Sequence, residues 1–279
     1  MNNRFRDYMI CVVPTVICLL LQNACMIFFS QINLIRVFLK LKEAPGTDIS
    51  AAFSESITSS GFLMGVSLCY AIIGILLFFH WYRGSVDDSK DSLKGYPFYL
   101  FFGILIFAIG SQFVSANIMA ILAHARPDWL ADYEELMKTV GLEDGGFDAL
   151  TILYTAVFGP ICEELCFRGL TQKFAMRVMR PYTAISIQAF LFGGMHANPM
   201  QSTYAFVFGW VIGFIYYKTN NLLISVLSHI TFNSLALIFS GYIGTGTTPV
   251  SFYCILLVSL LASYFGYSLI EKAQGEKDA

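Results

Sequence analysis

The sequence predicts an all-α protein, a polytopic bundle of about eight membrane-spanning helices. Hydrophobic residues make up 56% of the 279 residues and charged residues only 13%, against about 25% charged residues in ordinary soluble domains. The mean hydropathy over the whole chain is +0.64. The apolar residues fall into long runs rather than alternating patterns, as helices that cross a bilayer require.

The apolar runs define the expected spans, since a helix needs about 20 apolar residues to cross the hydrocarbon core. The first run is longer than the apolar part of a signal peptide and no small-residue cleavage site follows it, which predicts a retained helix. The fifth and sixth runs are short, so we expect polar cavities or other helices beside them. The eight expected spans are 8–35, 61–82, 97–124, 147–170, 183–197, 203–218, 222–241 and 250–270.

The chain divides into three parts. Residues 1–146 hold the first helices and an interfacial loop, residues 147–270 hold a helical core with polar motifs, and the charged cytoplasmic tail 271–279 is expected to be disordered. Within the first part, residues 126–146 predict a short amphipathic helix at the membrane interface. Its apolar stripe is Trp129, Leu130, Tyr133, Leu136 and Met137, and its closing residues are Gly145 and Gly146.

Charge and cysteine content restrict the class and the location of the protein. A net charge of −2 offers no basic surface for nucleic acid. With the N-terminus inside, twelve Lys and Arg residues fall on the cytoplasmic side and five outside, which predicts cytoplasmic termini in a bacterial cell membrane. The seven cysteines lie in apolar stretches. An odd number so placed argues against a secreted disulfide framework and favours packing.

Two adjacent carboxylates inside the fourth span form the first polar motif. Ionisable residues at membrane depth are costly, so each needs a reason. Glu164 and Arg168 are four residues apart, share a helix face and can pair, whereas Glu163 points about 100° away. A carboxylate in low dielectric holds a proton more tightly, as a general base near neutral pH requires. The alternative is a structural Glu–Arg pair with Glu163 reaching to water.

Two further polar motifs follow at intervals of about 33 residues. His196 lies near the end of the short fifth span, after Gly193 and Gly194, which allow close backbone approach. His229 and Asn233 are four residues apart in the seventh span and project from one face, so both can donate to one oxygen. Each motif taken alone fits a polar contact between helices equally well. Together they predict a site in the cytoplasmic half of the membrane.

These motifs resemble those of a known family. Glu163-Glu164-x-x-x-Arg168, Phe192-x-x-x-His196 and His229-x-x-x-Asn233 are similar to the motifs of the CPBP (Abi) family of intramembrane proteases, over roughly residues 147–241. That family includes type II CAAX prenyl proteases and bacteriocin-processing or bacteriocin-immunity proteins. The resemblance implies hydrolysis of a peptide bond, in a membrane-associated peptide or protein, by a glutamate-activated water.

The resemblance also implies a role for each motif residue. Glu163 would be the general base, His196 would help to hold or activate the water, and Arg168 would position Glu164. His229 and Asn233 would donate to the oxyanion, where one donor lowers the barrier by about 3–4 kcal/mol. Phe192 would shape the substrate pocket.

Several alternatives stay open. No cofactor is expected, but a zinc metalloprotease is the nearest rival because one Glu and two His are plausible ligands; the compact HExxH motif is absent. Cys162 or Cys166 as a nucleophile is less favoured, because no base is near in sequence. A transporter would place polar residues in both halves, and a non-catalytic scaffold or immunity protein would bind a partner. Gly209-x-x-x-Gly213 allows close helix packing within or between chains, so the oligomeric state is undetermined.

Overall fold

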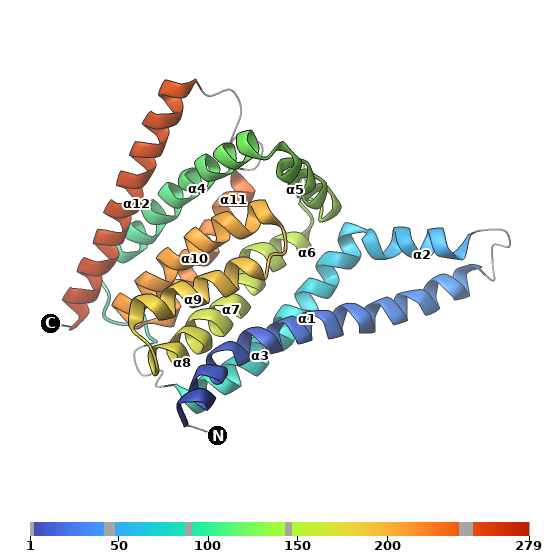
Figure 1. The fold of residues 1–279 in the computed structure, drawn as a ribbon, viewed down its shortest axis with the longest axis horizontal. Helices are drawn as coiled ribbons and strands as arrows, with labels where there is room; N and C mark the ends of the chain where they lie inside the picture. Colours follow the sequence, from blue (N-terminus) through green and yellow to red (C-terminus); the bar gives the residue numbers. More distant parts are fainter. Residues whose placement is uncertain (1–2, 42–47, 87–90, 143–146, 240–247, 279) are drawn as a thin grey trace.

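The computed structural model of the chain confirms the all-α fold class. It describes residues 3–41, 48–86, 91–142, 147–239 and 248–278, and these ranges contain helices and no strand (Figure 1). The helices are α1 (Asn3–Leu41), α2 (Ile49–Thr58), α3 (Ser60–Ser85), α4 (Tyr99–Ala125), α5 (Pro127–Thr139), α6 (Ala149–Ile152), η1 (Leu153–Phe158), α7 (Gly159–Glu164), η2 (Leu165–Gln172), α8 (Lys173–Met176), α9 (Pro181–Gly194), α10 (Pro199–Thr219), α11 (Leu222–Ile238) and α12 (Pro249–Asp278).

Five helices in the described ranges are long and apolar enough to cross a membrane. They are Tyr8–Leu39 within α1, α3, α4, the run Ala149–Met176, and α12. The other three expected spans form α9, α10 and α11. Helices α9 and α11 have 14 and 17 residues, or about 21 and 26 Å at 1.5 Å per residue, which is short of the roughly 30 Å hydrocarbon core. Helix α10 has 21 residues and is longer than its apolar run predicts.

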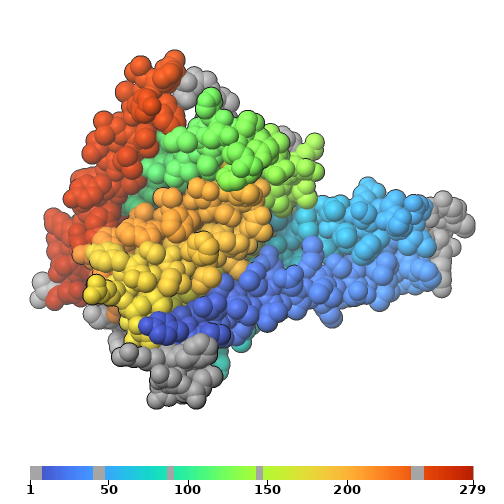
Figure 2. All heavy atoms as spheres, in the orientation of Figure 1, coloured from blue at the N-terminus to red at the C-terminus, as the bar shows by residue number. Residues whose placement is uncertain are grey.

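The helices that carry the polar motifs lie between two groups of other helices (Figure 1). Helices α4 and α12 pack along each other on one side, while α1 projects with α2 and α3 on the opposite side, as the space-filling view also shows (Figure 2). The α4–α12 contact depends on small residues: a methyl group at Gly266 would lie 2.7 Å from Gly103 O and would collide with the backbone of Phe107.

The run from α6 to α8 is one continuous helix that widens twice, at the π-helices η1 and η2. In η1 the N–H of Gly159 donates to Tyr154 O, five residues back. Pro160 follows; it has no N–H, and its ring would clash with a carbonyl four residues earlier, which explains the wider turn. Asp148 caps the start of this run by accepting from the N–H of Thr151 at 2.7 Å. Single π-turns often occur at functional sites.

The expected interfacial helix is present as α5. Its five predicted apolar residues are half-buried, while most of the intervening positions are exposed. The predicted end is wrong: α5 stops at Thr139, and Gly141 follows with a φ of +73°, which glycine adopts without strain. Gly145 and Gly146 lie outside the described residues.

The expectation of a disordered tail at 271–279 is also wrong, because α12 continues as a helix to Asp278. The tail packs against the segment 91–96. Lys277 Nζ donates to Ser92 O at 3.0 Å, and the Tyr96 hydroxyl donates to the buried side chain of Gln274. These tertiary contacts keep a charged sequence helical.

Segments expected on the cytoplasmic side meet at one end of the bundle. Arg177 donates to Ser85 O at 2.6 Å, and Asn221 donates to Ser92 O at 3.0 Å. The carboxylate of Asp91 accepts from the N–H of Leu222 at 2.7 Å, at the start of α11. The loops after α3, α8 and α10 and the end of α12 therefore share one face of the molecule, as the positions of Lys and Arg predict.

Candidate active site

Glu164 is the most completely buried carboxylate of the site, with a side chain that is 0% exposed. Its Oε1 atom accepts from Arg168 Nη1 at 2.7 Å and from His229 Nδ1 at 2.8 Å. The pair with Arg168 is the one that the spacing predicts, and it forms although η2 is wider than an α-helix. The contact with His229 joins the end of α7 to α11 across the core.

Glu163 has a more open environment. Its side chain is 20% exposed, and its Oε2 atom lies 3.7 Å from His229 Nε2. This separation is longer than a hydrogen bond. The imidazole of His229 therefore lies between the two carboxylates, bonded to one and facing the other. Glu163 is the more accessible of the two carboxylates.

His196 stands apart from the carboxylates. Its Nδ1 atom lies 3.0 Å from Phe192 O, one helical turn earlier. A backbone carbonyl only accepts, so Nδ1 carries the proton and the neutral ring keeps an acceptor at Nε2. No hydrogen bond or ion pair within the described ranges joins His196 to Glu163. The two motifs are linked through aromatic contacts instead.

Phe192 provides that link and is buried, at 2% exposure. Its ring centroid lies 5.1 Å from that of His196 and 5.8 Å from that of His229, both edge to face. The guanidinium of Arg168 lies over the same ring at 4.6 Å. A ring in this position holds both histidines and the arginine at fixed distances from one another.

Asn233 does not share an acceptor with His229. Its Nδ2 atom donates to Thr155 O in η1 at 2.8 Å, while the ring of His229 faces the carboxylates. An amide nitrogen has two protons, so one N–H of Asn233 remains for a further acceptor. The expectation that His229 and Asn233 bind a single oxygen therefore requires a ligand that reaches both.

The structure adds two glutamines that the motif analysis missed. Gln188 Nε2 donates to Gly209 O at 2.9 Å, an oxygen that also accepts from Arg168 at 3.2 Å, and Gln172 Nε2 donates to Gly213 O at 2.8 Å. The Gly-x-x-x-Gly motif thus serves contacts within the chain, because absent side chains expose the carbonyls. The signal was available in the sequence: both glutamines are polar residues inside apolar runs.

The cysteines behave largely as packing residues. Cys11, Cys18 and Cys25 recur every seven residues and are buried along α1, and Cys162 and Cys166 are 0% exposed in the core. None of the seven cysteines is in a disulfide, and Cys254 is exposed. The Sγ atom of Cys18 lies 3.4 Å from the Tyr70 hydroxyl.

The ligands that the zinc alternative requires are not assembled. No group of three or more His, Cys, Asp or Glu side chains in the described part of the chain is arranged to hold a metal ion. Glu163 and His229 adjoin, with Glu163 Oε2 3.7 Å from His229 Nε2. Glu164 is already occupied by Arg168 and His229.

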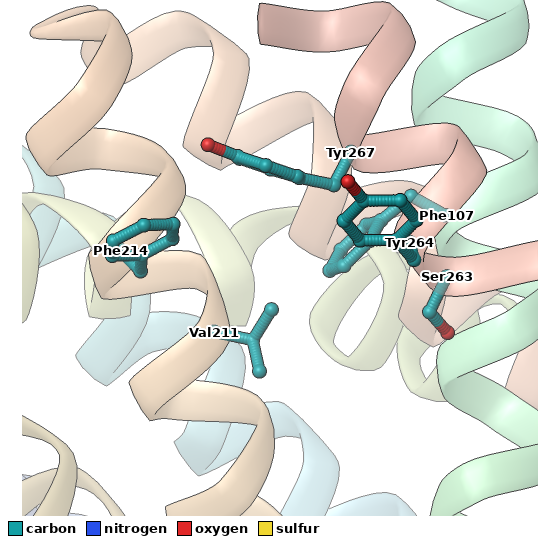
Figure 3. A pocket seen from close by; sticks show the side chains of 6 residues that line it. All are labelled: Phe107, Val211, Phe214, Ser263, Tyr264 and Tyr267. Carbon is teal, nitrogen blue, oxygen red and sulfur yellow. The ribbon is translucent and has the colours of Figure 1, made fainter. Parts of the chain in front are cut away.

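Two pockets lie away from these residues. The larger, of about 390 Å³, is formed where α10 faces α12 and α4 (Figure 3). Its lining residues are Phe107, Val211, Phe214, Ser263, Tyr264 and Tyr267. The smaller, of about 270 Å³, lies between α9 and α10 beside Gly193 and Gly194. Neither pocket is lined by Glu163, Glu164, His196 or His229.

The long apolar helices define an integral membrane protein. Residues 145–235 match the family described as type II CAAX prenyl endopeptidase Rce1-like. The match contains every motif residue from Glu163 to Asn233, so the chain carries an Rce1-like domain and the resemblance to the CPBP family is confirmed. No curated protein and no solved structure matches the chain.

Proposed function

We propose that the protein is an endopeptidase that hydrolyses a peptide bond in a membrane-associated peptide or protein by means of a water activated by Glu163. The difference between the two adjacent carboxylates carries this proposal. Glu164 is fully buried and bonded to Arg168 and His229, whereas Glu163 is 20% exposed, has no hydrogen bond from its side chain to another described residue, and lies 3.7 Å from His229 Nε2. One carboxylate is thus engaged in structure and the other is free for chemistry.

In the proposed reaction, Glu163 takes a proton from water and later gives it to the leaving amine. Glu163 accepts a proton from water as the water oxygen forms a bond to the peptide carbonyl carbon. When the C–N bond breaks, Glu163 returns that proton to the leaving amine. His229 Nε2 lies 3.7 Å from the same carboxylate, and Glu164 holds the imidazole in place through Nδ1. The acceptor at His196 Nε2 orients the water.

Asn233 is the proposed donor to the oxyanion. Its amide is anchored by the bond to Thr155 O and retains a second N–H. A donor held in place before the reaction stabilises developing charge without reorganisation. The ring of Phe192 contacts the rings of both His196 and His229. These contacts support its proposed role in shaping the substrate pocket.

The test is cleavage by purified protein in lipid vesicles. The family description makes a peptide with a prenylated C-terminal CAAX sequence the first substrate to use, with the same peptide lacking the prenyl group beside it. Glu163→Gln keeps the shape and removes the basic oxygen, so turnover should fall by about 10²- to 10⁴-fold with normal insertion. Glu276→Gln, an exposed site on α12, is the matched control.

Two outcomes would contradict the proposal in different ways. Near-normal turnover in Glu163→Gln would remove Glu163 as the base. Absence of cleavage by the native protein, across prenylated and unprenylated membrane peptides, would favour the non-catalytic scaffold or immunity protein. We also infer cytoplasmic termini from the distribution of Lys and Arg, and a C-terminal reporter active only outside the cell would contradict that orientation.

A further inference from the structure

A row of buried polar atoms on and beside η2 has no hydrogen-bond partner among the described residues. The side chains concerned are 0% exposed. Buried polar groups in proteins are nearly always hydrogen-bonded, so each exception needs an explanation. The atoms are Glu164 Oε2, Arg168 Nε, Gln172 Oε1 and Gln188 Oε1.

The orientation of the two amides is set by their partners. Gln172 and Gln188 both direct Nε2 at backbone carbonyls, those of Gly213 and Gly209. A carbonyl only accepts, so the nitrogen must lie there and the oxygen of each amide is left requiring a donor. Arg168 Nε is the opposite case, a donor that requires an acceptor. The row therefore needs a ligand that both donates and accepts.

These residues are linked by shared contacts. Glu164, Arg168 and Gln172 recur every fourth residue along α7 and η2, and Arg168 and Gln188 both donate to Gly209 O. Both amides meet at Gly213, where an added methyl group would collide with Gln188 Nε2 and lie 2.9 Å from Gln172 Oε1. Because Gly213 has no side chain, the two amides can lie side by side against α10.

The row continues to the end of the bundle where Asp91 lies. Tyr216 follows Gly213 by three residues on α10, and its phenol adjoins that of Tyr82. The Tyr82 hydroxyl donates to Asp91 Oδ2 at 2.7 Å. Polar groups thus extend from Glu164 in the core to a half-buried carboxylate in the loop after α3.

We propose that this row is a binding track for internal water molecules, which connects Glu164 with the Asp91 end of the bundle. Water both donates and accepts, and buried waters typically make about three hydrogen bonds to groups of this kind. Water binding here is independent of catalysis. Its use, the exchange of protons between the Glu164–His229 pair and the outside, rests on the proposed function.

Radiolytic labelling in ¹⁸O-water tests the track in the native protein without substrate. Brief X-ray pulses generate hydroxyl radicals from bound waters, and these oxidise adjacent side chains. Tyr216 is 1% exposed, so labelling there reports an internal water. We expect Tyr216 to be labelled at least several-fold more than Phe78, a fully buried core residue, with slower isotope exchange than at exposed tyrosines.

A matched pair of variants makes the test specific. Gln172→Leu removes the amide without adding a side chain that scavenges hydroxyl radicals, and we expect labelling of Tyr216 to fall several-fold. Gln112→Leu is the control, because Gln112 is a buried glutamine on α4 that donates to Phe232 O, outside the track. Gly213→Ala, which crowds the two amides, is a second variant should Gln172→Leu fail to fold, and the same loss is expected.

Labelling of Tyr216 at the level of Phe78, or equal labelling in the native protein and in both track variants, would overturn the proposal. The result is separable from the peptidase assay, since labelling needs no substrate. A protein that labels Tyr216 but cleaves no peptide would retain the water track and lose the proposed function.

Discussion

The Nδ1 atom of His229 lies 2.8 Å from Oε1 of Glu164, although 65 residues separate them in the chain. The same oxygen accepts from Arg168 at 2.7 Å. Three ionisable groups from two helices therefore fix one another in the core, and the far edge of the imidazole is directed at Glu163. Removal of any one member leaves the others with unpaired groups away from water.

Arg168→Ala should reduce both stability and activity. The variant leaves Glu164 as an uncompensated buried charge, which typically costs about 3–5 kcal/mol. Thermal unfolding in detergent would measure the loss. The control is Arg126→Ala, which removes an exposed pair with Asp128 and should leave the melting temperature unchanged. Equal melting temperatures for Arg168→Ala and the native protein would show that Glu164 has another source of compensation.

Asn233→Ala should reduce turnover by about 10²- to 10³-fold, the usual effect of removing one oxyanion donor. Its matched control is Asn117→Ala, since Asn117 is also a largely buried amide that donates to a backbone carbonyl, that of Phe113. Each variant loses one hydrogen bond, worth about 0.5–1.5 kcal/mol of stability, but only Asn233→Ala should lose turnover. Equal kcat values for the two variants would show that Asn233 only holds the structure, through its bond to Thr155 O, and does not stabilise the oxyanion.

Asp148, which precedes the span Ala149–Met176, should make stability depend on pH. The Thr151 N–H lowers the pKa of its carboxyl below the ordinary value. A lowered pKa means that the stabilisation is complete above the unfolded pKa of about 3.9 and is lost as the pH falls through the lower folded value. Asp148→Ala should therefore melt below the native protein at pH 7, by a typical cap energy of about 0.5–2 kcal/mol.

The difference between Asp148→Ala and the native protein should narrow as the pH falls below about 4, because the unfolded carboxyl then binds a proton before the native one does. Asp148→Asn keeps a capping oxygen without a titrating group, so its stability should show no such dependence. Melting curves at pH 7 and at about pH 3 provide the comparison. A difference that is unchanged at the lower pH would mean that the charge of Asp148 contributes nothing to the cap.

Activity should be insensitive to metal chelators, and the purified protein should contain no stoichiometric metal. The reason is geometric: Glu163 and His229 adjoin, but no group of three or more possible ligands is arranged to hold a metal ion among the described residues. Elemental analysis with parallel assays would test this. About one zinc per active chain, lost together with activity and restored with it, would overturn the glutamate mechanism and leave the peptidase proposal standing.

Properties that depend on local sequence were predictable. The transfer of a side chain into lipid depends chiefly on that side chain, so long apolar runs predict a helical membrane bundle. Residues four apart face the same way in a helix, so the Glu164–Arg168 pair follows from spacing. The polar motifs likewise stand out because charge is costly inside apolar runs.

Properties that depend on distant partners were not predictable. The tail to Asp278 is helical because Lys277 and Gln274 bond to the segment 91–96, and no local pattern contains that contact. The position of His229 between two carboxylates depends on the rotation and depth of α11 against η2, which packing sets. Asn233 reaches Thr155 O at the π-turn of η1. The residue types of the site are thus visible in the sequence. Which carboxylate is held in hydrogen bonds, Glu164, and which is more exposed, Glu163, is decided only when the helices pack.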